Sequence, residues 1–564
     1  MKLFNPNKYD RYHPDNKATD IIKATVDFFE KKGLKSIKED DQKSLWYEDY
    51  LSFVKENQVF ASMLTPEGYG ADDSRWDMWR ISEFNEVLGF YGLSYWYAWQ
   101  VSILGLGPIW MGDNEEVKKK TAKLLQEGGI FAFGLSEKNH GADIYSSSMT
   151  LYPQEDGTYL AKGEKYYIGN GNKAALVSTF AKVHGTGEYV FFAVDSQHEK
   201  YECVKKISTS GVRPAFVSEY RLNDYPITKD DILSIGQKAW DSALNTVNVG
   251  KYELGFASVG ICTHAFYEAM NHAANRELYG QKVTDFPHVK KLFTESYARL
   301  MAMKLYGHRA ADYMRTASAE DRRYLLYNPI MKMKVTGQGE QVVRMLHDVI
   351  AAKGFEQDTY FEMAIRDIGM LPKLEGTTHV NMALIIKFIK NYFFDKAEFE
   401  EFGSVSEAKN DDYLFNQVSG SLAKVRFPDY KRSFEGFEQA NLKIFNEQIE
   451  LFRDFLMNAG PSEKQLKNAD WMISAGEIFT LIPYAQLILE NAKLYKINDD
   501  LLNEIACFLV KDFSSFAYNM ILEHDLTEEQ DRIFHKMMKK PDSDRSSFES
   551  LWKNEVFALK DIYK

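Results

Sequence analysis

Few of the features that mark specialised protein classes occur in this chain. Its 564 residues include only three cysteines, Cys203, Cys262 and Cys507, which lie far apart and have no C-x-x-C neighbour. Neither a disulfide framework nor a zinc knuckle is indicated, so we expect reduced, mostly buried thiols. The twelve histidines form no H-x-x-H or H-E-x-x-H pair, and no metal site is predicted.

Excess positive charge and long apolar runs are also missing. The formal net charge is -12 and no basic stripe stands out, which argues against nucleic-acid binding. No stretch approaches the roughly 18 consecutive apolar residues of a membrane span, and Met1 to Asp15 lacks the apolar core of a signal peptide. We therefore expect a cytoplasmic protein. No G-x-G-x-x-G loop follows a strand, which excludes a Rossmann dinucleotide site.

What is present suffices for a large core. The chain is 45% hydrophobic and 14% aromatic, and its length predicts two to four folding units. Apolar residues recur at helical spacing from Ala18 to Gly128 and again from Trp240 to Phe394. Between them lie short runs rich in aromatic and β-branched residues, at 130–135, 148–152, 159–161, 165–168, 177–183 and 189–194.

This order predicts an α+β multidomain protein. We expect an N-terminal helical domain (1–128), a middle antiparallel β-barrel or sandwich (129–239), a helical bundle (240–395), and a linker with an extra C-terminal helical domain (396–564). The acidic stretch from Glu398 to Asn410 is interpreted as the linker. The later apolar stripe from Ile478 to Ile488, interrupted by Pro483, favours core helices over a helix lying on a membrane.

The most informative segment runs from Ile365 to Thr378. Its Arg-Asp pair, the Glu-Gly-Thr that begins eight residues after the aspartate, and the next threonine resemble the catalytic segment of the acyl-CoA dehydrogenase family. The resemblance implies that Glu375 removes the α-proton of a fatty acyl-CoA thioester while bound FAD takes a hydride from the β-carbon. It also places Leu374 and Gly376 at the substrate, and Thr377 and His379 near the flavin.

Two segments of the β region resemble the flavin bed of the same family. In Phe131 to Asp143, the resemblance assigns flavin contacts to Ser136, to main-chain groups of Phe133 and Leu135, and to the turn Gly141-Ala142, where the family usually has a serine. In Gly163 to Gly171 it assigns the stacking face to Tyr167, with Ile168 and the N-H of Gly169 beside it; Gly169 lacks the usual hydroxyl. From the residues alone, a plain β-hairpin closed by Asn170-Gly171 remains an alternative.

A further match covers Asn248 to Lys251 and Ala273 to Val283, and it resembles the very-long-chain branch. It implies that Arg276 binds the FAD pyrophosphate of a neighbouring subunit, with Tyr279 beside it, and that Lys251 replaces an active-site arginine. Gly250 stands where some relatives place their base, so Glu375 has no rival. The last segment, Asp348 to Phe355, supplies Asp348, Ala352 and Gly354 to FAD, although Ala351-Ala352 replaces a glycine pair.

The resemblance therefore predicts a FAD-dependent acyl-CoA dehydrogenase of fatty acid β-oxidation. An electron-transfer flavoprotein is the expected electron acceptor, and a homodimer is the expected assembly because of the extra C-terminal domain. Two alternatives stay open: an acyl-CoA oxidase that uses oxygen, and a non-catalytic flavin-binding relative that acts as an interaction protein. Peripheral membrane contact is the less favoured interpretation of the C-terminal helices.

Overall fold

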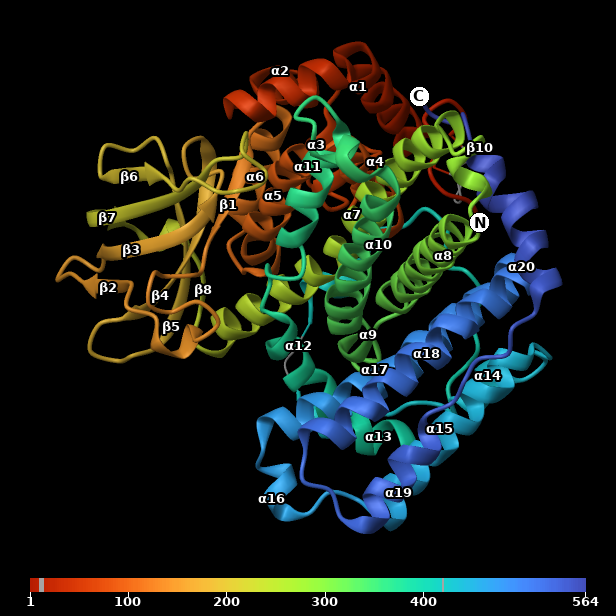
Figure 1. Cartoon of the computed structure of the whole chain (residues 1–564). Helices are drawn as coiled ribbons and strands as arrows, with labels where there is room; N and C mark the ends of the chain where they lie inside the picture. Colours follow the sequence, from red (N-terminus) through yellow and green to blue (C-terminus); the bar gives the residue numbers. More distant parts are fainter. Residues whose placement is uncertain (10–14, 418–419) are drawn as a thin grey trace.

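The computed structural model describes residues 1–9, 15–417 and 420–564. A β-sheet lies at one end of the molecule, a body of long helices occupies the middle, and the C-terminal helices pack beneath that body (Figure 1). The α+β organisation expected from the sequence is confirmed. The proposed boundaries of four separate domains stay a prediction.

The first helices are α1 (Asn16–Lys43), α2 (Glu48–Glu56), α3 (Val59–Leu64), α4 (Met78–Tyr91), α5 (Leu93–Met111) and α6 (Glu115–Gln126). The Asp77 side chain caps α4 by accepting hydrogen bonds from the N-H groups of Trp79 and Arg80. Every residue of α4 and α5 is buried. Because α5 is apolar on almost all sides, it can only lie inside the protein.

The strands are β1 (Ile130–Gly134), β2 (Thr150–Pro153), β3 (Tyr159–Gly169), β4 (Ala174–Val183), β5 (Tyr189–Val194), β6 (Tyr201–Lys206), β7 (Val217–Ile227) and β8 (Ile232–Ile235). They form one sheet in the order β6-β7-β3-β2-β4-β5-β8, and β1 pairs with β4. Most strand pairs of this sheet are antiparallel, as predicted, but β1 and β2 both run parallel to β4. Strands β6 to β8 were not foreseen.

The hairpin alternative at Asn170-Gly171 is wrong. Strand β2 lies between β3 and β4, so the turn joins two strands that are not paired with each other. Asn170 adopts φ 60°, and its side-chain amide donates to the carbonyl oxygens of Ala98 (3.1 Å) and Phe131 (3.0 Å). The turn thus fixes the end of β3 against α5.

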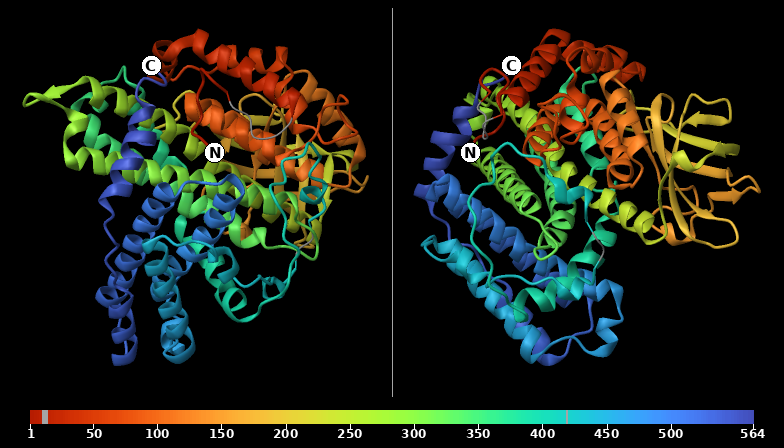
Figure 2. Two further views of the ribbon diagram at one scale, coloured as in Figure 1. Left: turned by 90° about the vertical axis from the view of Figure 1, so that its right-hand side faces the viewer. Right: turned by 180° about the vertical axis from the view of Figure 1, so that it is seen from behind.

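The helical body after the sheet consists of α7 (Gln237–Asn275), the short strands β9 (Glu277–Leu278) and β10 (Gln281–Lys282), α8 (Pro287–Arg315), α9 (Tyr324–Ile330), the π-turn η4 (Met331–Val335), α10 (Thr336–Ile350), the 3-10 turn η5 (Ala351–Phe355), α11 (Tyr360–Asp367), α12 (Thr378–Ile385) and α13 (Ile389–Phe394). Helix α7 is buried almost continuously from Asn248 to Ala274. The hairpin β9–β10 projects from its end (Figure 2).

The C-terminal part comprises α14 (Lys431–Phe434), α15 (Ala440–Asn458), α16 (Glu463–Leu466), α17 (Ala469–Tyr495), α18 (Asp499–Glu523), α19 (Glu528–Met537) and α20 (Arg545–Leu551). The expected linker is an irregular strap rather than a loose tether. The buried guanidinium of Arg315 donates to the carbonyl oxygens of Val405 (2.6 Å) and Glu407 (2.9 Å), and pairs with Asp411 (3.1 Å).

Helix α17 runs through Pro483 without interruption. Helices α17 and α18 are long and apolar enough, by length and composition alone, to cross a membrane; the expectation that no segment spans a bilayer stays a prediction. The apolar stretch of α17 is 78% buried, and that of α18 is 44% buried. Helix α17 packs on α8 and α12, where Gly476 allows the side chains of Met382 and Ile386 to approach closely. The prediction of a core helix holds for α17.

All three cysteines are free, as expected, with Cys262 buried and Cys203 exposed. No group of three or more metal-ligating side chains occurs in the described ranges.

Candidate active site

Glu375 lies between α11 and α12, three residues before α12 begins. The Thr377 side chain caps α12 by accepting a hydrogen bond from the N-H of Val380. Glu375 has φ 53° and Gly376 has φ 85°, so two consecutive residues adopt the left-handed region. This conformation is easy for glycine but costs a side-chain-bearing residue free energy, and such strain is concentrated at functional sites.

The surroundings of Glu375 shift its acidity towards neutral pH. Burial raises the pKa of Glu375 to about 7, while the positive charges of Lys251 and Lys332 oppose that rise. Burial likewise lowers the pKa of each lysine to about 8, and Glu375 opposes that change. A carboxyl group with a pKa near 7 is well matched to accept a proton at neutral pH.

Lys251 lies on α7 next to Gly250, which brings the helix backbone close to the base. A Cβ built on Gly250 would lie 3.5 Å from the carboxyl carbon of Glu375. It would also lie 2.6 Å from Leu104 Cδ2 and 3.0 Å from Gln100 Nε2. Gln100 Nε2 donates to the Gly250 carbonyl oxygen (3.2 Å). Position 250 therefore has no room for a side chain, and no alternative base can stand there.

The same face of α5 fills the space next to a second glycine, Gly169 at the end of β3. A Cβ at Gly169 would lie 2.6 Å from Val101 Cγ2 and 2.7 Å from Tyr97 Cε1. Residues 97, 100, 101 and 104 share one face of a helix because they are three or four positions apart. This stripe of α5 thus lies between β3 and the helix α7 that carries Lys251.

Tyr97 joins the two sides of the site. Burial raises the pKa of Tyr97, and the charge of Glu375 adds to that rise, so the phenol lies within electrostatic range of Glu375. Its hydroxyl would lie 3.0 Å from a Cβ at Gly169. The expected flavin position at Gly169 and the base Glu375 therefore adjoin the same side chain. Neither the composition nor the motifs pointed to Tyr97.

The expected flavin bed of the sheet is only partly available to a ligand. The Ser136 hydroxyl donates to the Tyr166 carbonyl oxygen (2.7 Å), and the Leu135 carbonyl oxygen accepts from Lys165 Nζ (3.0 Å). Phe133 is buried, and Ile168 packs in the apolar core of the sheet. The Ile168 side chain is therefore not available to a ligand, and only the Ile168 main chain could contact the flavin. Gly141 and Ala142 lie in an exposed turn.

Tyr167 stands out in this bed. Its side chain is 63% exposed although it belongs to a strand, and it adopts φ 63°. Thr377 and His379 are exposed beside the half-buried Glu375 and Leu374. An open aromatic face, a close main-chain approach at Gly169 and exposed polar groups next to the base suit a planar heteroaromatic cofactor. The residues present therefore fit the flavin ring of FAD.

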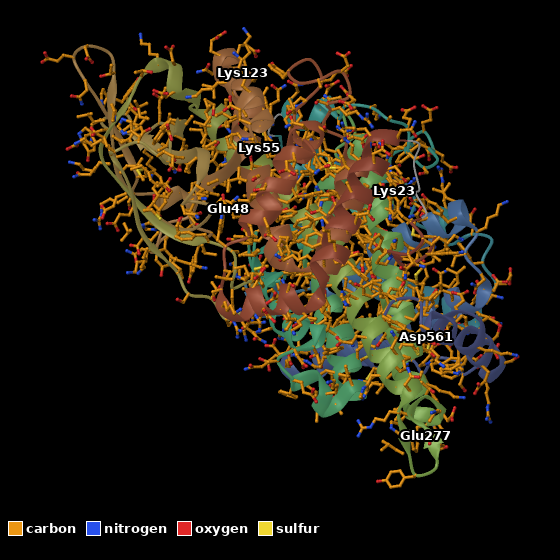
Figure 3. The ribbon with its side chains drawn as sticks, turned by 90° about the horizontal axis from the view of Figure 1, so that it is seen from above. Lys23, Glu48, Lys55, Lys123, Glu277 and Asp561 are labelled. Atoms are coloured by element: carbon orange, nitrogen blue, oxygen red, sulfur yellow. The ribbon has the colours of Figure 1, made fainter. Side chains whose placement is uncertain are left out.

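Arg276, Tyr279, Asp348, Ala352 and Gly354 form a second surface. Arg276 lies next to His272 at the end of α7, and Arg276 and Lys353 of η5 together lower the pKa of the partly buried His272 further than burial does alone. From Lys251 to Arg276 the chain follows α7 for 25 residues, which corresponds to roughly 40 Å. Tyr279 is 96% exposed and lies between β9 and β10, in the hairpin whose Glu277 is labelled in Figure 3. The structure does not bring this surface to Glu375 of the same chain.

The Ala351-Ala352 pair keeps a glycine-like backbone. Ala351 has φ 54° and ψ -137°, which is unfavourable for any residue with a Cβ. Both alanines are exposed, so their methyl groups project outwards. Gly354 is buried against His347, where a Cβ would lie 2.8 Å from the imidazole. The turn thus retains the shape that a glycine pair would take, at the cost of strain.

The Arg366-Asp367 pair fixes the catalytic segment to the rest of the molecule. Asp367 accepts the N-H of Val212 (2.9 Å) in the loop before β7, and Arg366 pairs with Asp41 of α1 (2.6 Å) and Glu362 (2.9 Å). Two separate parts of the chain are thereby held against α11. This pair positions the segment and does not enter the space around Glu375.

Lys332 is the main residue that the sequence did not reveal. It is fully buried in η4, and its ammonium donates to the carbonyl oxygens of Pro372 and Gly376. Its only signal is a lysine within an apolar helical run of Ile330, Met331, Met333 and Val335.

Two family models match the chain. One, described as acyl-CoA dehydrogenase, middle domain, covers residues 132–225. The other, described as acyl-CoA dehydrogenase, C-terminal domain, covers residues 238–390. The matched segments contain most of the sheet and the helices α7 to α12, whereas α5 lies outside them.

Three relatives illustrate the similarity. A 3-(aryl)acrylate reductase from Clostridium sporogenes is 24% identical over 65% of this chain and 96% of its own length. A short-chain specific acyl-CoA dehydrogenase from Megasphaera elsdenii is 22% identical over 64% of this chain and 95% of its own. The crystal structure of an acyl-CoA dehydrogenase complexed with FAD from Bacillus anthracis superimposes with a TM-score of 0.75 at 18% identity, over 98% of this chain and 97% of that one. The last comparison shows that the whole fold, including the C-terminal helices, has a counterpart.

Proposed function

The chain belongs to the acyl-CoA dehydrogenase family and is a FAD-dependent enzyme, and from this premise we propose that it converts a fatty acyl-CoA thioester to the trans-2-enoyl-CoA with Glu375 as the base. The observation that carries this role is the carboxyl group of Glu375, held in a strained loop with a pKa of about 7 and two lysines near it. An ionised carboxylate in this setting accepts the α-proton of the thioester.

The chain contributes the acid-base and electrostatic part of the reaction. The ionised Glu375 takes the α-proton, and its own N-H can donate to the thioester oxygen as negative charge develops there. Gly376 leaves that backbone accessible, and Lys251 adds positive charge close to the base. When bound, FAD supplies the acceptor for the hydride equivalent that leaves the β-carbon.

The residues that would hold FAD come from two chains. Main-chain groups of Phe133, Leu135, Ile168 and Gly169, with Ser136, Tyr167, Thr377 and His379, lie on the Glu375 side. Arg276, Tyr279, Asp348, Ala352 and Gly354 lie at the far end of α7, roughly 40 Å away. A single cofactor can use both sets only if the second set belongs to a partner chain. We therefore propose a homodimer, which light scattering would test; a tetramer would count against it.

The electron acceptor is proposed to be an electron-transfer flavoprotein. Two matches support this proposal. A relative 24% identical to this chain is a subunit of a caffeyl-CoA reductase-Etf complex from Acetobacterium woodii. A structural neighbour comes from work on the electron transferring flavoprotein of Acidaminococcus fermentans. The alternative of an acyl-CoA oxidase is tested by mixing the reduced enzyme with air. Rapid reoxidation with peroxide formation would support the oxidase.

Anaerobic bleaching of the flavin spectrum with a panel of acyl-CoAs tests the base. The wild type should bleach with at least one acyl-CoA, and Glu375→Gln should bleach at least about 10²-fold more slowly, because removal of a catalytic base typically costs 10²–10⁴ in rate. Glu340→Gln is the matched control, since Glu340 pairs with Lys373 on the exposed side of the same segment. Equal bleaching of wild type and Glu375→Gln would show that the base is elsewhere.

A further inference from the structure

Lys332 differs from the other fully buried lysines of the described chain. Lys38, Lys165 and Lys304 each pair with a carboxylate, from Glu362, Glu137 and Glu86 respectively. Lys332 is 0% exposed and forms no such ion pair; its ammonium is bound by two main-chain carbonyl oxygens instead. A lysine is almost never fully buried without a carboxylate unless its charge serves a specific purpose.

The two carbonyl groups lie on either side of the base. Pro372 precedes Glu375 by three residues, and Gly376 follows it directly. The Gly376 oxygen also accepts a hydrogen bond from Asn381 Nδ2 (3.1 Å). Between these fixed points the backbone takes the left-handed conformation at both Glu375 and Gly376. A side-chain-bearing residue keeps that conformation only where its surroundings enforce it, and Lys332 contacts both ends of the strained stretch.

The position of Lys332 depends on an irregular turn. Helices α9 and α10 are separated by the π-turn η4, which follows Pro329, a residue without an N-H to donate. A π-turn adds a residue to the helix and re-aims the side chains that follow it, and such turns occur frequently at functional sites. The Thr336 hydroxyl donates to the Lys332 carbonyl oxygen within this turn.

The charged and titratable groups that face Glu375 come from three elements. They are Tyr97 on α5, Lys251 and Glu253 on α7, and Lys332 on η4. Burial and Glu375 both raise the pKa of Glu253, which disfavours its ionised form. The two lysines are the groups that favour an ionised Glu375.

We propose that Lys332 is a positioning residue for the base: its ammonium fixes the backbone on both sides of Glu375 and supplies one of the two charges that keep the carboxylate ionised. This inference rests on the proposed function of Glu375 as the base. Lys332 itself exchanges no proton with the substrate and acts only through the loop and its charge.

The test compares three variants of the full-length, FAD-loaded protein. Lys332→Met removes both the donor and the charge, and Lys332→Gln keeps a donor without the charge. Lys334→Met is the matched control, because Lys334 lies two residues further along the same turn and pairs with Asp512 of α18 (3.1 Å). The first readout is the infrared band of the protonated Glu375 carboxyl group, identified by its loss in Glu375→Gln, followed against pH. The second is kcat with the best acyl-CoA.

We expect Lys332→Met to raise the titration midpoint of Glu375 by at least about one pH unit, since a neighbouring opposite charge typically shifts the pKa of a carboxyl group by about one to three units. Its kcat should fall by about tenfold to 10²-fold, because misplacement of a catalytic group by about 1 Å can cost 10². Lys332→Gln should show the same midpoint shift with a smaller loss of kcat. If Lys332→Met does not fold, the Gln variant alone decides the charge effect.

An unchanged midpoint in both Lys332 variants would overturn the proposal, and so would an equal shift in Lys334→Met. The infrared titration needs no turnover. A wild type that no acyl-CoA bleaches would therefore refute the proposed function, while the dependence of the Glu375 midpoint on Lys332 would still be measurable.

Discussion

Replacement of Gly169 by serine tests how tightly α5 closes the site. The serine would add the hydroxyl that the resemblance to the family leads one to expect here, but its Cβ would lie 2.6 Å from Val101 and 2.7 Å from Tyr97. Carbon atoms in ordinary contact are about 3.5–4.0 Å apart, so β3 or α5 would have to move by about 1 Å. Both contacting side chains belong to a fully buried helix, which leaves them little room to yield.

Overpacking of this kind costs about 1–3 kcal/mol. For a cooperative unit of 150–250 residues each kcal/mol lowers Tm by about 2–4 °C, so Gly169→Ser should lower Tm by roughly 2–12 °C. The assay is a thermal unfolding scan of the FAD-loaded protein at a fixed scan rate. Gly403→Ser is the control, because a Cβ at Gly403, in the strap before α14, meets nothing within 4 Å.

A double variant of α5 tests whether the contacts with Tyr97 and Val101 cause the loss of stability. In Tyr97→Ala/Val101→Ala the space is already open, and adding Gly169→Ser should then change Tm by much less than it does in the wild type. Wild-type thermal stability in the single variant Gly169→Ser would refute the close packing between α5 and β3. An undiminished loss in the triple variant would show that the strain comes from the strand and not from α5.

Three further predictions concern the pH dependence of activity, the pH dependence of stability, and the binding of FAD by the second surface. Because the base must be ionised and the pKa of Glu375 is about 7, kcat/KM should rise as the pH increases from 6 to 8. The folded-state pKa of Glu375 lies above its ordinary value of 4.5, so the contribution of this group to stability is complete below pH 4.5 and is lost as the pH rises through about 7. The free energies of unfolding of wild type and Glu375→Gln, measured in urea, should therefore be similar at low pH and differ at neutral pH. Arg276→Ala should weaken FAD binding by about 10- to 100-fold, as expected for loss of a hydrogen bond to a charged group, without moving the infrared midpoint of Glu375. Lys282→Ala on the same hairpin is its control, and unchanged flavin affinity in Arg276→Ala would mean that the hairpin does not hold the phosphates.

The fold was largely predictable because hydrophobic periodicity reports local structure. The alternation of helical and strand-like runs located the sheet between two groups of helices. Periodicity does not report which strands are neighbours, and the pairing of β4 with both β1 and β2 depends on contacts between residues far apart in sequence. A turn sequence such as Asn170-Gly171 is equally compatible with a hairpin and with the observed crossing over α5.

The proposed base, Glu375, could be picked out from the sequence because proton abstraction demands one residue type in a distinctive local sequence, and its role stays a prediction. Lys332 and Tyr97 could not be picked out, since a lone lysine or tyrosine within an apolar helix has no local signature. Their roles arise from what they approach: the carbonyl groups on either side of Glu375, and the space beside Gly169. The same holds for Gly169 and Gly250. From the sequence alone each glycine only lacks an expected functional group, whereas the structure shows that side chains of α5 fill the space beside it.

The packing of α17 against α8 and α12 has a consequence for how this enzyme could be divided. Relatives near 380 residues match only about two thirds of this chain, which suggests at first a removable C-terminal module. Yet α12 begins three residues after Glu375, and Met382 of α12 and the adjacent Ile386 pack on Gly476, while Asp512 pairs with Arg299 and Lys334. A protein cut in the strap would expose these apolar and charged surfaces together and would be prone to aggregate. The catalytic unit therefore extends to the C-terminal helices, and the enzyme cannot be shortened to the length of its smaller relatives without redesign of that face.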